Sequence, residues 1–161
     1  MLFEDYHLFE FEAGGRCYDV PDPEDLYERK TFAARNVRIT ALIERGIATF
    51  SYTYDFGDNW RHTITVEAVE DGNPSIEYPR FIDGERRAPP EDVGSTSGFE
   101  EFLNVMAKPR HAQHREFVRW YGGRFEPEDL SVDIIQDRVA KIARRRTLGK
   151  AGFAKSQNQQ H

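Results

Sequence analysis

The sequence is short of cysteine, of long apolar runs and of glycine-rich phosphate loops. Cys17 is the one cysteine among 161 residues, so no disulfide can form within the chain and no zinc site can be built from cysteines. No apolar stretch approaches the roughly 18–20 residues that cross a bilayer. The acidic, aromatic start MLFEDYHLFE lacks the regions of a signal peptide. We therefore expect a cytoplasmic protein without a membrane partner.

Aromatic residues are what the chain has in quantity. They make up 13% of the sequence and include twelve phenylalanines and seven tyrosines. Each buries a large area, so one hydrophobic core can form at this length. We therefore predict one domain over residues 1–146, followed by a tail over residues 147–161. The Gly, Lys, Ser, Gln and Asn content of that tail predicts disorder.

Charge is distributed unevenly along the chain. The sequence carries 22 Lys and Arg against 28 Asp and Glu, a net charge of −6. Residues 141–161 hold six of the basic residues and no acidic one, which leaves a net charge of −12 on residues 1–140. The basic segment Lys141–Lys155 could contact nucleic acid through phosphates, although cations near a helix C-terminus also favour the helix dipole. The acidic body repels the same phosphates.

Alternating and β-branched residues predict strands in the first half of the chain. Residues 7–11 and 16–18 around a turn at 13–15 are typical of a hairpin, with Cys17 as an ordinary strand residue. The stronger hairpin is Ile47–Asp55 with Trp60–Val69, because two β-rich runs flank a Gly-Asp-Asn turn. Pro21–Asp25 predicts a loop, and residues 76–82 a further strand.

Helix start and stop residues dominate the second half. Thr40 is expected to cap a short helix over 41–45, and Ser97 a helix with an apolar stripe that ends before Pro109. Further helices are predicted over 111–121 and 132–145. Because strands come first and helices last, we predict an α+β fold. It consists of an antiparallel sheet built from hairpins, followed by C-terminal helices that pack on it.

Linked motifs carry a family resemblance. The hairpin segment YDFGDNWRH is followed by Pro89–Gly94 and then by Gly98–Leu103, and His7–Phe11 matches as well. Over roughly residues 5–140 the chain resembles the plasmid pRiA4b ORF-3-like family. Its members are also described as passenger proteins of an IS1096-type mobile element. The resemblance implies an α+β fold and no established activity.

The chain departs from the family pattern in two places. Family members generally begin with a strand and an amphipathic helix ahead of the segment that starts at His7, and we expect both to be missing here, because Met1 lies just ahead of that segment. Their absence is expected to leave a sheet edge and an apolar face uncovered. Either a protein partner or a second copy covers them, or the chain is a truncated gene product. Gly94-Ser95 stands where the pattern usually has two glycines, which puts the geometry of that loop in doubt.

The hairpin tip and the proline–acid loop hold the residues most able to do chemistry. If the two segments converge, they offer carboxylates and an imidazole for acid–base catalysis or for Mg²⁺, Mn²⁺ or Zn²⁺. No cofactor is predicted and no residue is assigned as a metal ligand, so a divalent metal is only an alternative. The candidate catalytic residues are Asp58, His62 and Glu91. The wider candidate binding set is Tyr54, Asp55, Asp58, Trp60, His62, Pro90, Glu91 and Asp92.

Structural roles are the stronger interpretation of these residues. Asp55 and Asp58 flank a turn glycine, where aspartate bonds its own backbone. His62 alternates onto the face of Trp60 and is expected in the core. Aromatic residues of the hairpin could stack nucleobases, yet core packing is favoured because Arg61 is the one basic residue among them.

A second histidine pair is less informative. His111 and His114 have a spacing that could bind metal on a helix. No third ligand is visible nearby in the sequence, so a solvated helix face is favoured.

Three hypotheses of function follow. The first is a non-catalytic interaction or accessory module of plasmids or mobile elements. The second is a metal-dependent hydrolase or nuclease-like enzyme that uses the hairpin tip and the loop. The third is nucleic-acid binding through the basic tail. The balance leans away from an enzyme.

Overall fold

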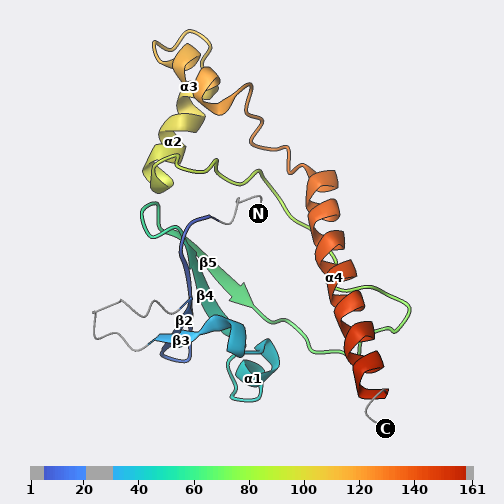
Figure 1. Ribbon diagram of the computed structural model, residues 1–161. Helices are drawn as coiled ribbons and strands as arrows, with labels where there is room; N and C mark the ends of the chain where they lie inside the picture. Colours follow the sequence, from blue (N-terminus) through green and yellow to red (C-terminus); the bar gives the residue numbers. More distant parts are fainter. Residues whose placement is uncertain (1–5, 21–30, 159–161) are drawn as a thin grey trace.

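The computed structural model describes residues 6–20 and 31–158 (Figure 1). The loop predicted at Pro21–Asp25 lies outside this part of the chain. Five strands form one sheet in the order β3-β2-β1-β4-β5. Their bounds are β1 Phe9–Ala13, β2 Arg16–Asp19, β3 Thr31–Ala33, β4 Thr49–Tyr54 and β5 Trp60–Thr65.

The sheet is mixed, so the prediction of a purely antiparallel sheet is wrong. β1 pairs antiparallel with β2 and β4, and β4 with β5, as in the two predicted hairpins. β3 instead pairs parallel with β2, with Tyr18 opposite Phe32. A parallel pair needs a long crossover connection, and a three-residue strand is too short for an alternating pattern to reveal it.

Two predicted strand segments differ from the structure. β5 ends at Thr65 rather than Val69, because its partner β4 begins at Thr49 and the ladder closes with Val66 N–H donating to Ala48 O. Residues 76–82 form no strand. Pro79 within that segment lacks the N–H that a ladder requires.

The helices follow the predicted order. They are the short 3₁₀ helix η1 (Ala34–Asn36), α1 (Ile39–Ile43), α2 (Ser95–Met106), α3 (His114–Tyr121) and α4 (Val132–Asn158). α2 begins two residues before Ser97, which is therefore not its cap. Gly94 at φ 88° takes that position. α3 ends at Tyr121, and Gly122, also at φ 88°, caps it, as the glycine predicts.

α4 continues through residues 147–158, the segment for which composition predicts a disordered tail. The difference has a local cause, since Ala, Lys, Leu and Gln are good helix formers and extend a helix that has already nucleated. The single-domain boundary at residue 146 stays a prediction. Among the described residues, no helix is long and apolar enough to cross a membrane.

Most of the buried side chains form two groups, and Ile135 and Ala143 on α4 are buried as well. One lies on the sheet and α1, where Ala13, Tyr18, Leu42 and Phe50 make a small core. The other lies between α2 and α3 around Phe102, which is fully buried. Its ring contacts those of Phe99, Phe117, Trp120, Tyr121 and Phe125.

The two groups are joined through the tip of the β4–β5 hairpin. The rings of Trp60 on β5 and Phe99 on α2 meet edge to face at 6.3 Å. In Figure 1, α2 and α3 continue beyond this end of the sheet, while α4 runs apart from it. The broad prediction of an α+β protein is confirmed, and packing of the C-terminal helices on the sheet stays a prediction.

Candidate functional site

The tip of the β4–β5 hairpin is organised by Asp55. This residue is buried and has the left-handed backbone conformation (φ 56°) that Asp tolerates in turns. Its Oδ1 accepts a hydrogen bond from Gly57 N–H at 2.9 Å, and its carbonyl oxygen accepts one from Asn59 N–H at 2.6 Å. The second carboxylate oxygen of Asp55, Oδ2, takes part in neither of these bonds.

The start of β1 brings a histidine to this tip. Phe9 lies opposite Tyr54 in the β1–β4 ladder, and Asp55 N–H donates to the carbonyl of Leu8 at 2.9 Å. The residue before Leu8 is His7, which therefore lies beside Asp55. Its Nε2 is 3.8 Å from Asp55 Oδ2.

The loop before α2 closes on the same tip through two hydrogen bonds. Tyr54 Oη donates to Glu91 Oε1 at 3.1 Å, and Gly94 N–H donates to Asp58 Oδ2 at 3.1 Å. The hairpin tip and the proline–acid loop thus meet, although they are far apart in the sequence.

A run of unusual backbone conformations shapes the loop. Asp92, Gly94 and Ser95 all have positive φ, at 56°, 88° and 65°. A side chain at Gly98 would meet the carbonyl oxygen of Val93 at 2.1 Å, so only glycine fits there. The left-handed φ of Ser95 explains physically why a glycine suits this position in the family pattern.

Three carboxylates surround the imidazole of His7. Its Nε2 lies 3.8 Å from Glu91 Oε2 and 3.3 Å from Asp92 Oδ1, in addition to the Asp55 contact. The side chains of Asp55 and Glu91 are largely buried, whereas that of Asp92 is 64% exposed. His7 Nε2 is shielded from solvent and makes no well-formed hydrogen bond within the described residues. We call His7, Asp55, Glu91 and Asp92 the His7 cluster.

Tyr54 contributes an apolar ring and a polar hydroxyl group to the His7 cluster. It is 1% exposed, and its ring meets that of His7 edge to face at 5.8 Å. Burial raises the pKa of Tyr54 above its ordinary value of 10.0, and the neighbouring Glu91 carboxylate raises it further, against backbone hydrogen bonds that lower it. The phenol therefore stays a neutral donor that orients Glu91.

The structure separates the sequence candidates into two groups. It brings Tyr54, Asp55, Asp58, Glu91 and Asp92 to the junction, and Pro90 lies half-buried in the same loop.

Trp60 and His62 have other surroundings. Trp60 is a buried core residue in contact with Phe99. The Nδ1 of His62 lies 3.2 Å from the carbonyl oxygen of Tyr52, the residue opposite it in the β4–β5 ladder. Both lie on the same face of β5, as alternation predicts, with Trp60 buried and His62 half-buried.

His7 is the residue that sequence reasoning missed. The sequence predicts a strand over residues 7–11, but it indicates neither the strand order nor the register. The register of β1 and β4 that places Phe9 opposite Tyr54 also places His7 at the hairpin tip. The one sign of His7 in the sequence is its place two residues before the apolar strand residue Phe9. Histidines at such positions are common in proteins and usually have no function.

The other histidine pair gives no comparable arrangement. The Nδ1 of His114 lies 3.0 Å from the carbonyl oxygen of Val105, and His111 Nδ1 accepts from Gln113 N–H. Within the described residues, the group able to hold a metal ion is His7, Asp55 and Asp92.

The mixed sheet, the hairpin tip and the loop before α2 define an α+β protein with one polar junction. The chain belongs to the plasmid pRiA4b ORF-3-like family, whose model matches residues 1–134. This confirms the family resemblance.

Two relatives support the assignment. The chain is 32% identical to the uncharacterised protein y4hQ of Sinorhizobium fredii, over 88% of this chain and 76% of that protein. It is similar in structure to MM3350, a protein of unknown function from Methanosarcina mazei Go1. The TM-score is 0.68 and the identity 31%, over 78% of this chain and 71% of that one.

Proposed function

We propose that the protein is a binding module that holds a divalent cation in the His7 cluster. Its ligands are His7 Nε2 and one carboxylate oxygen from each of Asp55 and Asp92. The observation that carries this proposal is that the three atoms lie within 4.8 Å of one another around a shielded Nε2.

The distances suit a small cation. Two ligands bound to Zn²⁺ at about 2.1 Å in tetrahedral geometry lie about 3.4 Å apart. His7 Nε2 and Asp92 Oδ1 are 3.3 Å apart, and Asp55 Oδ2 is 3.8 Å from the same nitrogen. The exposed Asp92 side chain supports entry of the ion from solvent.

The neighbouring groups hold the ligands in place. Asp55 is fixed by Gly57 N–H, and the 91–92 segment is fixed by Tyr54 through Glu91. Bonds of this kind orient ligands and strengthen metal binding. One imidazole and two carboxylates suit Zn²⁺ or Mn²⁺ better than Ca²⁺, which takes oxygen ligands alone.

The biological role we propose for this module is non-catalytic and accessory to plasmids or mobile elements, in line with the family description. A metal-dependent hydrolase is the second candidate. The exposed side of the cluster at Asp92 favours it, because a catalytic ion keeps an open position for water or substrate. Of the sequence candidates for catalysis, Glu91 alone has an oxygen near His7 Nε2.

Calorimetric titration of the EDTA-treated chain with Zn²⁺ and with Mn²⁺ tests cation binding. We expect one ion per chain, with affinity lowered at least tenfold in His7→Ala and in Asp92→Asn. His111→Ala removes a histidine elsewhere and should bind as the unaltered chain does.

Because Asp92 is exposed, its variant leaves the core intact and keeps the test valid if His7→Ala unfolds. Absence of binding of both ions at about 100 µM, or equal binding by Asp92→Asn and the unaltered chain, would exclude the site.

A further inference from the structure

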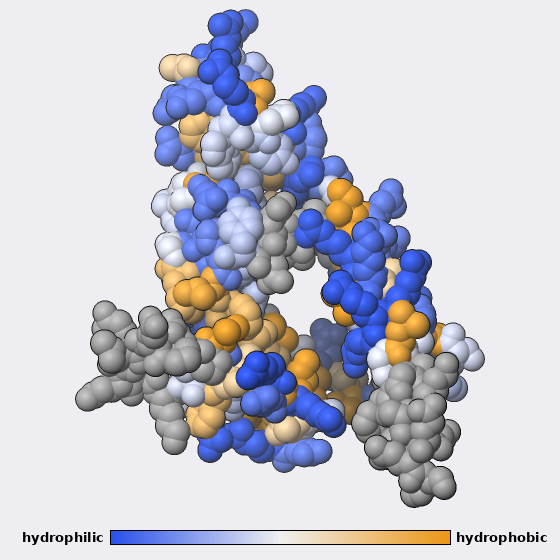
Figure 2. Space-filling view, in the orientation of Figure 1, coloured by the Kyte–Doolittle hydropathy of each residue, from blue (hydrophilic) through white to orange (hydrophobic). Residues whose placement is uncertain are grey.

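The helices α2 and α3 form a unit that is separate from the sheet. We call residues 95–125 the helical lobe, whose core is the ring cluster around Phe102. Among the described helices and strands, α2 and α3 contact each other extensively, whereas no such contact joins either of them to a strand. Figure 2 shows an opening between the sheet and α4. The hairpin tip is therefore the main link between the sheet and the helical lobe.

Few described contacts make up this link. One is the edge-to-face contact of the Trp60 and Phe99 rings, which crosses from β5 to α2. The others are the two hydrogen bonds that join the hairpin tip to the loop before α2. Hydrogen bonds of this kind each contribute little net stability. A link of this size permits the helical lobe to change its angle to the sheet, as in a hinge.

The loop end of the link carries both strain and charge. Asp92 and Ser95 have left-handed φ values of 56° and 65°, and such conformations persist in residues other than glycine only where the surroundings enforce them. The carboxylates of Asp55, Glu91 and Asp92 also converge on one imidazole. Like charges at this separation repel one another. Strain and repulsion both favour separation of the loop from the hairpin tip when no cation is bound.

The proposed cation ligands come from both sides of the link. His7 and Asp55 belong to the sheet, because His7 leads into β1 and Asp55 N–H donates to the Leu8 carbonyl. Asp92 belongs to the loop that leads into α2 and lies three residues before that helix begins. A cation held by all three ligands replaces the repulsion with attraction and ties the start of the helical lobe to the sheet.

We propose that the cation works as a staple that sets the orientation of the helical lobe on the sheet. This inference rests on the cation site proposed above. With the cation bound, the lobe holds one orientation. Without it, the lobe samples several, and binding shifts the population toward the closed one. The His7 cluster thereby makes the position of α2 and α3, and the surface that they present to a partner, depend on cation concentration.

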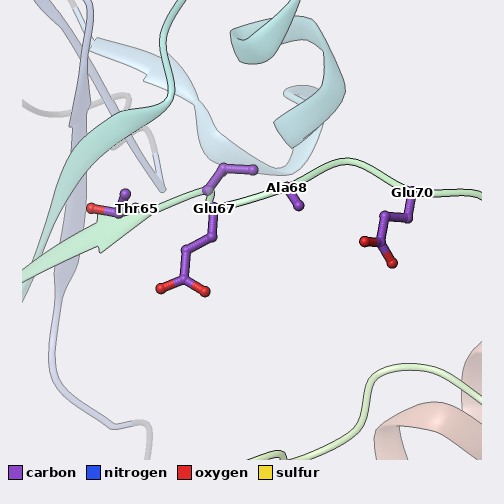
Figure 3. A pocket seen from close by; sticks show the side chains of 5 residues that line it. Thr65, Glu67, Ala68 and Glu70 are labelled. Atoms are coloured by element: carbon purple, nitrogen blue, oxygen red, sulfur yellow. The ribbon is translucent and has the colours of Figure 1, made fainter.

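Exposed carboxylates elsewhere in the chain provide a control. After β5, Glu67 and Glu70 line a shallow pocket together with Thr65, Val66 and Ala68, and the two glutamates point to the same side of the chain (Figure 3). The described lining of this pocket includes no histidine. An effect of Zn²⁺ that came from surface charge alone would involve such carboxylates as well.

Distances between two spin labels, measured by electron resonance on the full chain, test the staple. Cys17→Ser removes the natural thiol, and the labels are attached at Thr63→Cys on β5 and Arg119→Cys on α3, two exposed positions. We expect a broad distance distribution after EDTA treatment, and saturating Zn²⁺ should reduce its width to roughly half or less. A label pair within the sheet, Arg16→Cys with Thr63→Cys, should give the same distribution in both states.

Two further variants of the labelled chain assign the effect to the His7 cluster. Asp92→Asn removes the ligand on the loop side and should keep the distribution broad when Zn²⁺ is added. Glu67→Gln with Glu70→Gln removes the exposed control carboxylates and should narrow as the unaltered labelled chain does. Narrowing that persists in Asp92→Asn, or that is lost in the Glu67 and Glu70 variant, would overturn the staple.

Calorimetric titration of the same labelled chain with Zn²⁺ separates the staple from the cation site itself. Zn²⁺ binding without narrowing would overturn the staple and leave the cation site standing. A distribution that is already narrow after EDTA treatment would do the same, because the link would then be closed without a cation. Absence of Zn²⁺ binding would overturn the proposed cation site, and the staple with it.

Discussion

The hairpin tip and the α4 helix differ in how their contacts are completed. At the tip, Asp55, Asp58 and Glu91 each bond a group from a neighbouring turn, strand or loop of the same chain. On α4, Ile134 and Ile142 are about half exposed, although Ile135 and Ala143 on the same helix are buried. The tip is closed by contacts within the chain, whereas α4 keeps part of its apolar surface exposed.

The difference shows where to look for each kind of function. Closed polar contacts fix side chains to a few tenths of an ångström, which a cation site requires. Exposed apolar and cationic side chains on a long helix offer area and charge for a macromolecular partner.

Replacing Phe102 by alanine should lower the free energy of unfolding by about 3–5 kcal/mol. The ring is fully buried and contacts five other aromatic rings, so its removal leaves a cavity. Ile142→Ala, at a position 45% exposed on α4, is the control and should cost under about 1 kcal/mol. Urea unfolding at low concentration measures both. Similar costs for the two would erase the contrast between the regions.

Alkaline pH should loosen the hairpin tip. The raised pKa of Tyr54 means that the folded chain favours the neutral phenol. Its contribution to stability is therefore complete below pH 10 and is lost as the pH rises through the raised value. Unfolding measured between pH 9 and about 12 should show a decline that is smaller in Tyr54→Phe. An identical decline in both chains would assign the effect to other groups.

Ser95→Gly should stabilise the loop by up to about 1 kcal/mol. A left-handed conformation costs a non-glycine residue about 1–2 kcal/mol. Glycine avoids this cost but loses more backbone entropy on folding, so the net gain in stability is smaller. Thermal unfolding should show a higher midpoint for this variant. Ser97→Gly, two residues further into α2, should lower the midpoint instead, because glycine is a poor helix former. A lower midpoint for Ser95→Gly would mean that its side chain contributes more than the backbone strain costs.

Local patterns predicted the hairpins and the order of helices well. The β4–β5 hairpin follows from two β-rich runs around Gly57, and the end of α3 follows from Gly122. These features depend on neighbours in sequence. The parallel pairing of β3 and the start of α2 at Ser95 depend on distant contacts or on backbone strain, which no local pattern records.

Local patterns in the sequence are enough to indicate the family, the α+β class and the segments from which a polar site could be built. Turn chemistry, alternation and charge act over a few residues and can be read in order. The folded chain is needed to show that His7, and not the predicted His62, joins Asp55, Glu91 and Asp92. The reason is register: pairing β1 with β4 places His7 at the hairpin tip. Such a pairing is settled by the packing of the whole sheet.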